Sequence, residues 1–231
     1  MIDLREIFKN LAYLASTRFW ETIINYSVIR TSKSSLVPRE VRSEIPKDLY
    51  FEDVHRRIGF NQPLLFLEFG VYKGDSIRKW SQMNQCSESR FFGFDSFIGL
   101  PEKWRQHPIG YFDMGGRVPN ISDSRVTFVK GGFNMTLPQW LRTNASSVAA
   151  PTVVIHIDSD LYSSALYILT QLHPVFAQYN VLFDDYCAGE ARALRDYIAA
   201  YGAVFHPILG RCRKRYSRVP MQVFGIINTR T

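Results

Sequence analysis

The chain has few cysteines, and their spacing suggests neither a disulfide framework nor a metal knuckle. Cys86, Cys187 and Cys212 are far apart and odd in number, and no CxxC pair occurs. A disulfide-stapled domain and a zinc knuckle are therefore not indicated. Free thiols are typical of a reducing compartment, so we expect the protein in the cytoplasm.

Long hydrophobic runs are also missing near the N-terminus. The stretch MIDLREIFKNLAYLASTRFW is interrupted by charges at Asp3, Arg5, Glu6, Lys9 and Arg18. It contains neither the uninterrupted apolar core of a signal peptide nor enough apolar residues for a membrane helix. We therefore expect no transmembrane segment.

Three common active-site motifs are absent from the chain. No G-K-[ST] occurs, which argues against a P-loop, and no Tyr is followed four residues later by Lys, the pair of short-chain dehydrogenases. The G-x-S-x-G nucleophile elbow is missing as well. Nucleotide hydrolysis, this type of dehydrogenation and serine hydrolysis are therefore not indicated.

The composition is that of a folded, moderately basic protein. With 231 residues, 46% of them hydrophobic, the chain suits one α/β domain plus an N-terminal extension. The formal net charge is +7, and part of the excess lies in GRCRKRYSR, residues 210–218. This segment is a solvated loop, a site for an acidic substrate or anionic surface, or a nucleic-acid footprint. Because no recognised nucleic-acid-binding motif accompanies it, we expect no nucleic-acid partner.

The first part of the chain differs in pattern from the rest. Apolar residues recur every three to five positions over 4–30, which predicts one or two amphipathic helices. These helices could pack on the domain, join two subunits into a homo-oligomer, or lie on a membrane surface. Residues 30–40 are polar and predict a linker. We divide the chain into an N-terminal helical extension, 1–45, and a main domain, 46–231.

Beyond the linker, short apolar runs alternate with helical patterns. Strands are predicted at 64–69, 91–95, 126–130, 152–158, 180–184, 203–208 and 221–228, and helices at about 75–84, 136–143, 162–178 and 188–201. This alternation predicts an α/β fold with a doubly wound, mostly parallel, seven-stranded sheet. No helical pattern separates the last two strands, so we expect the last strand to be antiparallel.

The stretch LLFLEFGVYKGDS, residues 64–76, predicts a strand, a glycine turn and a helix start. Gly70 and Gly74 allow a ligand to approach the backbone at the strand end. The spacing is not the dinucleotide G-x-G-x-x-G, and Glu68 suits an ammonium or sulfonium better than a phosphate. Asp95 ends the next strand, where an acid can bind ribose hydroxyls. Together these segments predict a nucleoside pocket, although a plain connection and a turn cap remain alternatives.

Carboxylates end two later strands. VIHIDSD carries Asp158 and Asp160, and VLFDD carries Asp184 and Asp185 to the same edge of the sheet. Oxygen donors with open positions suit Mg²⁺, so Asp158, Asp184 and Asp185 are the candidate metal ligands. His156 is either buried in its strand or a ligand for a softer metal. The alternative is a cluster of caps and hydrogen bonds to substrate hydroxyls.

Four segments resemble class I S-adenosylmethionine-dependent methyltransferases and, within that class, the macrocin O-methyltransferase family. They are FLEFGVYKGDSI (66–77), FFGFDSFIGLPEKW (91–104), VIHIDSDLYSS (154–164) and VLFDDYCAGEARALRDY (181–197). The family methylates sugar hydroxyls in natural-product pathways. The resemblance therefore implies a Rossmann-like methyltransferase fold, S-adenosylmethionine as cofactor, and a small-molecule acceptor with a sugar hydroxyl.

The resemblance also implies roles for individual residues. A metal, expected to be Mg²⁺, would grip two vicinal acceptor hydroxyls and lower the pKa of the one to be methylated. Its ligands would be Asp158, Asp184 and Asp185. The cofactor would be held at its methionine end by Glu68, Gly70 and Gly74 with Ser76 nearby, at its ribose by Asp95 with Ser96, at its adenine by Gly132 and Phe133, and flanked by Asp158.

One departure from the family pattern concerns the general base. Related metal-dependent enzymes carry Lys or His three residues after the acid that ends the fourth strand. In this chain that acid is Asp158, and Leu161 stands three residues later. We expect the catalytic residues among Asp158, Asp160 and His156, and the candidates for the general base are Asp160, Tyr162, His107 and His156. The alternative functions are methylation of a phenolic or polysaccharide acceptor, and a non-catalytic nucleoside- or nucleic-acid-binding protein of the same fold.

Overall fold

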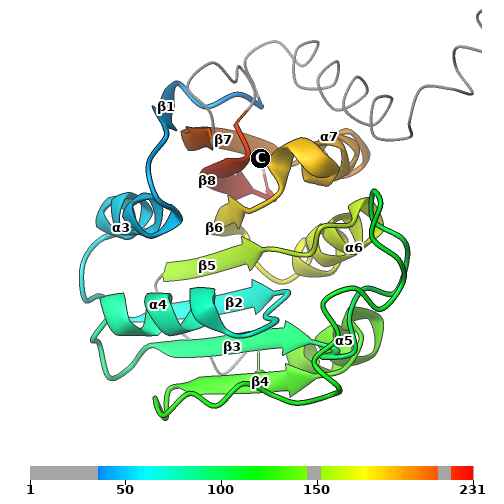
Figure 1. Ribbon diagram of the computed structural model, residues 1–231. Coiled ribbons are helices and arrows are strands. Elements are labelled where there is room, and N and C mark those ends of the chain that lie inside the picture. The colour runs from blue at the N-terminus through cyan, green and yellow to red at the C-terminus, as the bar shows by residue number, and fades with distance from the viewer. Residues whose placement is uncertain (1–35, 145–151, 213–219, 231) are drawn as a thin grey trace, which may run out of the picture.

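The computed structural model describes residues 36–144, 152–212 and 220–230 (Figure 1). The predicted helices within 4–30 and most of the basic segment 210–218 lie outside the described residues. Within the described residues, no helix is long and apolar enough to cross a membrane.

A single mixed sheet of eight strands organises the described chain. Its spatial order is β1-β7-β8-β6-β5-β2-β3-β4, and β8 runs antiparallel to both of its neighbours while the other pairings are parallel. The predicted doubly wound fold with an antiparallel last strand is confirmed. The strands are β1 (Glu40–Ser43), β2 (Leu64–Phe69), β3 (Arg90–Asp95), β4 (Val126–Lys130), β5 (Thr152–Ile157), β6 (Gln178–Phe183), β7 (Val204–Cys212) and β8 (Gln222–Asn228).

Helices cover both faces of this sheet (Figure 1). Helices α3 and α4 enclose one core with Phe66, Val154 and Leu182 of the strands, and α5, α6 and α7 enclose the other. Their bounds are α3 (Lys47–Ile58), α4 (Asp75–Met83), α5 (Phe133–Asn144), α6 (Tyr162–Leu172) and α7 (Glu190–Tyr201), and a short 3₁₀ turn, η1 (Tyr186–Ala188), precedes α7.

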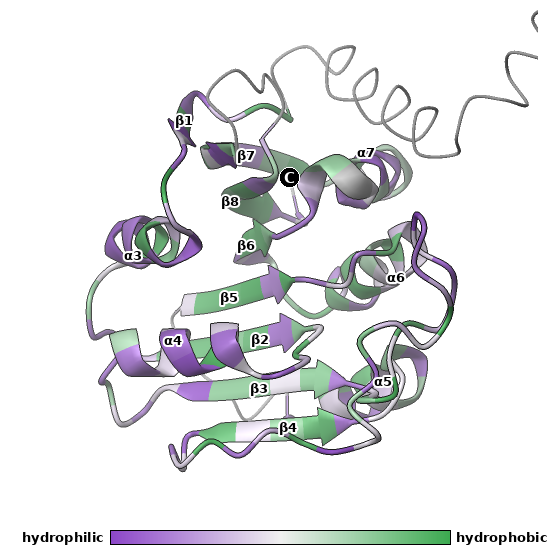
Figure 2. Cartoon of the chain, viewed as in Figure 1, coloured by the Kyte–Doolittle hydropathy of each residue, from purple (hydrophilic) through white to green (hydrophobic). Residues whose placement is uncertain are grey.

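The central strands are apolar over their whole length because both faces are covered. All six residues of β2 are buried. Five of them are apolar, and the sixth, Glu68, is charged. In Figure 2 the middle of the sheet is mostly coloured as hydrophobic, whereas much of the ribbon of α3 and α4 is coloured as hydrophilic. This pattern explains why continuous apolar runs located these strands in the sequence.

The sheet has one strand more than the seven expected. Strand β1, with the sequence EVRS, pairs in parallel with the outer side of β7 and is mostly exposed. A four-residue polar edge strand gives almost no hydrophobic signal, and Val41 is its one apolar residue. The nearby Leu36 is buried in the core, and its carbonyl accepts a hydrogen bond from the Tyr186 hydroxyl at 2.7 Å. Residues 36–43 thus pack with the sheet, although they fall in the stretch assigned to the extension.

The order of the strands places a crevice at the centre of one sheet edge. Strand β2 lies between β3 and β5, so the chain proceeds to one side through β3 and β4 and then returns to the other through β5 and β6. At such a switch point the connections leave in opposite directions and open a space beyond the carboxyl ends of the strands. The loops after β2, β3 and β5 border that space.

Candidate active site

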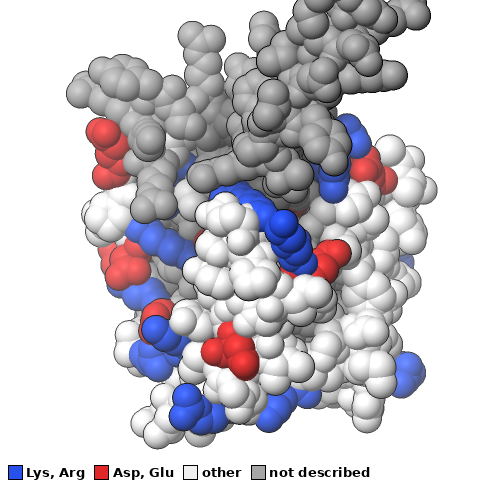
Figure 3. Space-filling model, turned by 45° about the vertical axis from the view of Figure 1, so that its right-hand side comes forward, with Lys and Arg blue, Asp and Glu red and all other residues white. Residues whose placement is uncertain are grey.

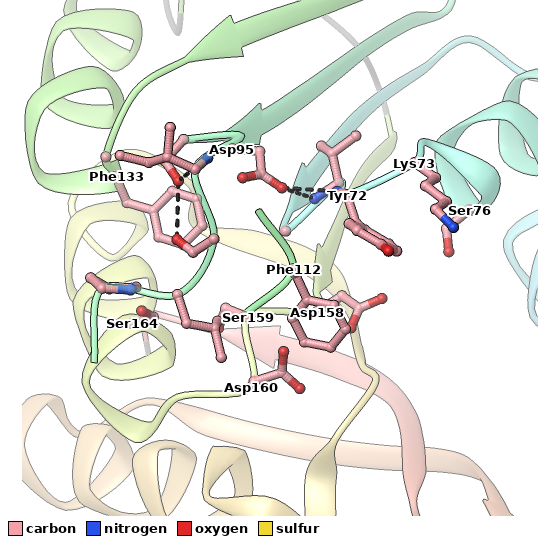
Figure 4. A pocket seen from close by; sticks show the side chains of 18 of the residues that line it. Tyr72, Lys73, Ser76, Asp95, Phe112, Phe133, Asp158, Ser159, Asp160 and Ser164 are labelled. Atoms are coloured by element: carbon pink, nitrogen blue, oxygen red, sulfur yellow. Dashed lines mark hydrogen bonds between the residues drawn. The ribbon is translucent and has the colours of Figure 1, made fainter. Parts of the chain in front are cut away.

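A pocket of about 900 Å³ occupies this crevice. Its wall comes from the loops after β2, β3, β4 and β5 and from the start of α3. Most of the residues predicted for a cofactor or catalytic site line it, and they come from distant parts of the sequence (Figure 4). Those residues are Gly70, Ser76, Asp95, Ser96, Gly132, Phe133, Asp158 and Asp160.

Gly70 joins the two sides of this pocket. Its φ is +94°, and a Cβ at this position would lie 1.9 Å from the carbonyl oxygen of Asp158. A side chain is therefore excluded both by the backbone conformation and by the close approach of the loop after β5. Its amide donates to the Phe94 carbonyl at 3.0 Å, which fixes the turn against β3.

Asp95 holds the glycine turn through backbone donors. Its Oδ2 accepts hydrogen bonds from the amides of Val71 and Tyr72, both at 2.8 Å, and its Oδ1 accepts one from Phe97 at 2.8 Å (Figure 4). A carboxylate has about four acceptor positions, so one on Oδ1 is left for a ligand. Asp95 thus shapes the pocket and faces it at the same time.

The remaining cofactor candidates divide into two groups. Ser76, Ser96, Gly132 and Phe133 line the pocket, and the Phe133 ring packs edge-on against Phe69 with centroids 5.6 Å apart. Gly74 does not line it: its left-handed conformation caps α4, and a Cβ there would lie 3.2 Å from the Cβ of Pro119. Its role in the structure is to make the turn into α4.

Glu68 also lies apart from the pocket wall. Its side chain is fully buried, and its Oε1 lies 2.9 Å from His156 Nδ1 on the neighbouring strand β5. The two residues are direct partners in the β2–β5 register, so their side chains share the face covered by α3 and α4. The sequence signal at Glu68 therefore belongs to a buried network that continues toward the acids.

That network ends in a group of possible metal ligands. The candidate ligand atoms of His156, Asp158 and Asp184 all lie within 4.8 Å of one another. Asp185 is outside this group, and its side chain forms a hydrogen bond with Asp160. The structure thus brings Asp158 and Asp184 together and gives Asp160 and Asp185 to a second, adjoining pair.

A lysine that the sequence did not indicate enters this group. Lys47 is the first residue of α3, and its Nζ lies 2.8 Å from Asp184 Oδ1 and 3.4 Å from Asp158 Oδ2. Lysines are common on helix surfaces, and a separation of 111 residues from Asp158 gives no local pattern to notice. Lys47 also lines the pocket.

A second missed residue, Gln222 of β8, supports Asp184 from behind. Its amide nitrogen donates to Asp184 Oδ1 at 2.6 Å, and its oxygen accepts from Arg211 at 2.8 Å. Arg211 also donates to the carbonyl of Ile45 at 2.7 Å. The orientation of the Gln222 amide is thereby set, and Arg211, part of the basic segment, has an internal structural role.

The charges of the acid cluster are poorly balanced. Burial by itself raises the pKa of Asp184, but Lys47 and His156 outweigh it and hold that pKa well below its usual range. Burial and the charge of Asp184 raise the pKa of Asp158 to about 7, and burial and Asp185 raise the pKa of Asp160 to about 9. Two acids therefore lack the positive charge that would keep them ionised.

His156 is committed on both ring nitrogens. Burial lowers its pKa, but hydrogen bonds to Asp184 and Glu68 outweigh burial and raise the pKa to about 9. The protonated ring donates to Glu68 Oε1 and, at 3.5 Å, to Asp184 Oδ1. Because a protonated imidazole has no lone pair for a metal, this geometry favours His156 as a support for Asp184.

Of the four candidates for the general base, Asp160 is the one that lines the pocket within the described residues. The Tyr162 hydroxyl donates to Asp196 at 2.9 Å, and the His107 ring stacks on Tyr111 with centroids 3.8 Å apart. His156 is fully buried. Asp160 also has a positive φ of 61°, an uncommon conformation that turns its backbone at the pocket edge.

Glu190, the first residue of α7, lies behind the acids. It is fully buried, and its Oε2 accepts a hydrogen bond from the Asp185 amide at 3.1 Å. Burial and the charge of Asp185 hold the Glu190 pKa well above its usual range. Glu190 thus fixes the backbone at Asp185 and does not line the pocket.

Comparisons with known proteins agree with this architecture. A family model described as Macrocin-O-methyltransferase (TylF) matches residues 116–208. The solved O-methyltransferase NovP is similar in structure, with a TM-score of 0.56 and 19% identity over 92% of this chain and 99% of that one. The O-methyltransferase TomG from Streptomyces achromogenes, solved with S-adenosylmethionine, gives a TM-score of 0.48 and 12% identity over 100% of both chains. No curated protein sequence matches the chain significantly.

The family match covers the loops after β4 and β5 and the acids at the ends of β5 and β6. NovP, at low identity, shows the fold. The family match and this fold confirm the predicted resemblance to the macrocin O-methyltransferase family and support an S-adenosylmethionine-dependent O-methyltransferase.

Proposed function

We propose that the protein transfers a methyl group from S-adenosylmethionine to a hydroxyl on the sugar of a glycosylated small molecule, with a divalent metal, Mg²⁺, bound by the acids at the ends of β5 and β6. The observation that carries this proposal is that one pocket is lined both by Gly70, Asp95 and Phe133 and by the acids Asp158 and Asp160. A nucleoside site and a site for hydroxyl activation would thus adjoin.

The cofactor would occupy the side of the pocket formed by β2, β3 and the start of α5. The free acceptor position on Asp95 suits a ribose hydroxyl, and the Phe133 ring offers a face or edge to the adenine. Gly70 admits the cofactor chain close to the backbone. On this proposal Glu68 and Gly74 act indirectly, by supporting the acids and the turn.

The acid cluster suits a divalent cation in its chemistry. Its donors are carboxylate oxygens, the ligands that Mg²⁺ prefers, and the raised pKa values of Asp158 and Asp160 reflect a shortage of positive charge. Two buried carboxylate oxygens nearby, Glu68 Oε2 and Glu190 Oε1, have no hydrogen-bond partner among the described residues. Asp158 and Asp184 would hold the ion, and Asp185 would join them after a change of side-chain orientation.

A bound Mg²⁺ would lower the pKa of the acceptor hydroxyl. The pocket would hold the acceptor hydroxyl next to the methyl group. The hydroxyl oxygen would form a bond to the methyl carbon as the carbon–sulfur bond breaks, leaving S-adenosylhomocysteine. The hydroxyl proton would pass to Asp160, which a nearby metal ion would keep ionised by offsetting the burial and the charge of Asp185 that otherwise raise its pKa. Positioning of donor and acceptor in one pocket would supply much of the rate.

The mouth of the pocket favours an acceptor with an apolar body. Ile98 and Ile109 line the pocket with 62% and 69% of their surface exposed, and Tyr72 and Phe112, which also line it, pack together with ring centroids 5.2 Å apart (Figure 4). Exposed apolar side chains at a pocket mouth bind an apolar part of a ligand. A sugar attached to a natural-product skeleton meets this chemistry better than a free sugar or a polysaccharide.

The nucleic-acid alternative gains no support from the face of the molecule drawn in Figure 3. On the face drawn in Figure 3, Asp and Glu side chains are interspersed among the Lys and Arg side chains. Nucleic-acid-binding faces instead gather Lys and Arg into a continuous patch. Arg211 is engaged with Gln222 and Ile45.

The proposal is tested by methyl transfer from radiolabelled S-adenosylmethionine to a panel of glycosylated macrolides, glycosylated aromatics, free catechols and oligosaccharides. Each assay is run with Mg²⁺ and with EDTA. We expect label in a glycosylated acceptor, equimolar S-adenosylhomocysteine, and loss of transfer in EDTA. Transfer to catechols alone would contradict the sugar hydroxyl as acceptor and favour a phenolic one. Full transfer in EDTA would contradict the role of the metal.

A further inference from the structure

Lys47 holds an unusual place in the acid cluster. Its ammonium contacts both Asp158 and Asp184, the two carboxylates proposed to hold the metal. A metal bound directly to these oxygens would lie about 2.0–2.1 Å from them, within the space that a lysine nitrogen at hydrogen-bond distance already fills. Lys47 and a metal bound to the same oxygens would therefore collide and repel each other.

The position of Lys47 is fixed by the rest of α3. The Tyr50 hydroxyl donates to the Leu209 carbonyl at 3.0 Å, and the Phe51 ring packs edge-on against His156 with centroids 5.6 Å apart. The Lys47 ammonium lies 5.3 Å from the centre of the Phe51 ring. The helix thus presents the lysine to the carboxylates from an anchored backbone.

The helix itself gives no reason for a lysine at this position. A positive charge in the first turn of a helix is opposed by the helix dipole, and acidic residues are favoured there. Lys47 is the first helical residue, preceded by Pro46. Its two carboxylate partners explain why the charge is tolerated.

The ammonium also has a way out of the cluster. The Lys47 side chain is 34% exposed and lines the pocket, whereas the Asp184 side chain is 10% exposed. Rotation of the flexible lysine side chain can carry its nitrogen into the pocket while the carboxylates stay in place. An arginine or lysine enclosed on all sides would lack this freedom.

We propose that Lys47 is a tethered cation that occupies the metal site when no metal is bound and that a divalent metal displaces it into the pocket. This inference rests on the proposed metal site. It assigns Lys47 a regulatory effect on metal binding: the lysine competes with other cations for Asp158 and Asp184 and thereby lowers the affinity of the site for the metal. Metal binding would at the same time add a positive charge to the pocket wall.

The experiment is a titration of the full-length protein with Mn²⁺, in which free Mn²⁺ is measured by electron paramagnetic resonance at fixed pH and ionic strength. Lys47→Met removes the charge and keeps a side chain that packs on Phe51, and we expect it to bind Mn²⁺ about tenfold more tightly than the wild type or better. Lys47→Arg keeps the charge and should bind no more tightly than the wild type. Lys79→Met, which removes a lysine paired with Glu52, is the matched control and should match the wild type.

The outcomes separate the two proposals. If Lys47→Met binds Mn²⁺ as the wild type does or more weakly, Lys47 does not compete with the metal and this inference is wrong. If the wild type and Lys47→Met bind no more Mn²⁺ than Asp184→Asn, the metal site fails and this inference fails with it.

A second measurement uses the wild-type protein and does not depend on any variant. Lysines are acetylated with a limiting amount of acetic anhydride, and the labelled peptides are quantified by mass spectrometry with and without Mn²⁺. We expect labelling of Lys47 to rise severalfold with Mn²⁺ while labelling of Lys79 stays constant. Equal labelling of Lys47 in both conditions would overturn the displacement.

Discussion

The two sides of the pocket hold their charged groups by different means. On the cofactor side, the side of Gly70, Asp95 and Phe133, one carboxylate accepts hydrogen bonds from three backbone amides. On the acid side, the side of Asp158, Asp160, Asp184 and Asp185, the carboxylates depend on side chains from other elements. The first arrangement rests on backbone donors of one turn and its neighbouring loop. The second rests on side chains that reach the acids from α3, β5 and β8.

The comparison explains what each side can do. A carboxylate fixed by backbone amides keeps one geometry and suits recognition of an invariant group such as a ribose. A cluster that lacks positive charge binds cations and shifts the pKa values of its members, which suits the activation of a hydroxyl. Variants that damage one side and spare the other test this division.

The largest effect is expected on the acid side. Asp184→Asn removes the charge that Lys47, Gln222 and His156 all face, and we expect metal-dependent turnover to fall at least about 10³-fold. The affinity for S-adenosylmethionine, measured by calorimetry, should change less than about twofold, because Asp184 is not part of the pocket wall. Asp196→Asn, at a carboxylate that faces Tyr162 and Arg195, is the control. Unchanged turnover by Asp184→Asn would remove this residue from the metal site.

The next effect concerns the point where both sides meet. Gly70→Ala would place a Cβ 1.9 Å from the Asp158 carbonyl oxygen and force alanine to a φ of +94°. Backbone strain and overpacking together should lower the free energy of unfolding by about 3 kcal/mol or more. Urea denaturation followed by circular dichroism measures this.

Gly115→Ala separates the two causes, because Gly115 also has a positive φ, +62°, but a Cβ there meets nothing within 4 Å. We expect it to lower the free energy of unfolding by only about 1 kcal/mol. Equal effects of the two substitutions would show that the contact between Gly70 and the loop after β5 is not tight.

On the cofactor side, Asp95→Ala should weaken S-adenosylmethionine binding by roughly 1–3 kcal/mol, since it removes a ligand contact and frees three backbone donors. Mn²⁺ binding should be unaffected, which is the reverse of the Asp184→Asn result. Asp113→Ala, at a turn carboxylate that accepts one amide hydrogen bond from Gly115, is the control. Unchanged calorimetric affinity for Asp95→Ala would exclude the ribose assignment.

The same contrast decides what the sequence could reveal. The glycine turn and Asp95 are visible because strand ends and glycines leave local patterns, and the partners of Asp95 lie within 24 residues of it. Lys47 and Gln222 leave no such pattern, because they reach Asp184 from α3 and β8 through the strand order. The place of Glu68 near a strand tip predicts a contact with the cofactor, but its register partner is His156.

For the fold, burial made the difference. Central strands with both faces covered are continuous apolar runs, and their predicted bounds agree with the structure to within a few residues. Strand β1 is short, polar and at an edge, so the sequence does not predict it. No helix is predicted at α3, which follows the Pro-punctuated linker and buries Tyr50, Phe51 and Val54 on its inner face.

The smallest predicted effect involves another titratable side chain of α3 that faces the protein interior. His55 is 1% exposed, packs against Trp80 with ring centroids 5.9 Å apart, and has no hydrogen-bond partner for its Nε2 within the described residues. Burial lowers its pKa, so the folded protein holds it neutral while the unfolded chain takes up a proton below about pH 6.5. Its contribution to stability is thus complete above pH 6.5 and is lost as the pH falls.

His55→Phe should therefore flatten the decline of the free energy of unfolding between pH 7 and pH 5, by at most ~1.4 kcal/mol per pH unit. Asp158 and Asp160, whose pKa values are raised to about 7 and about 9, change stability in the opposite direction, but they do so in both proteins. The difference between wild type and variant in urea titrations at each pH isolates His55. A constant difference across this range would mean that His55 accepts a proton in the folded protein, and that α3 tolerates a second cation behind Lys47.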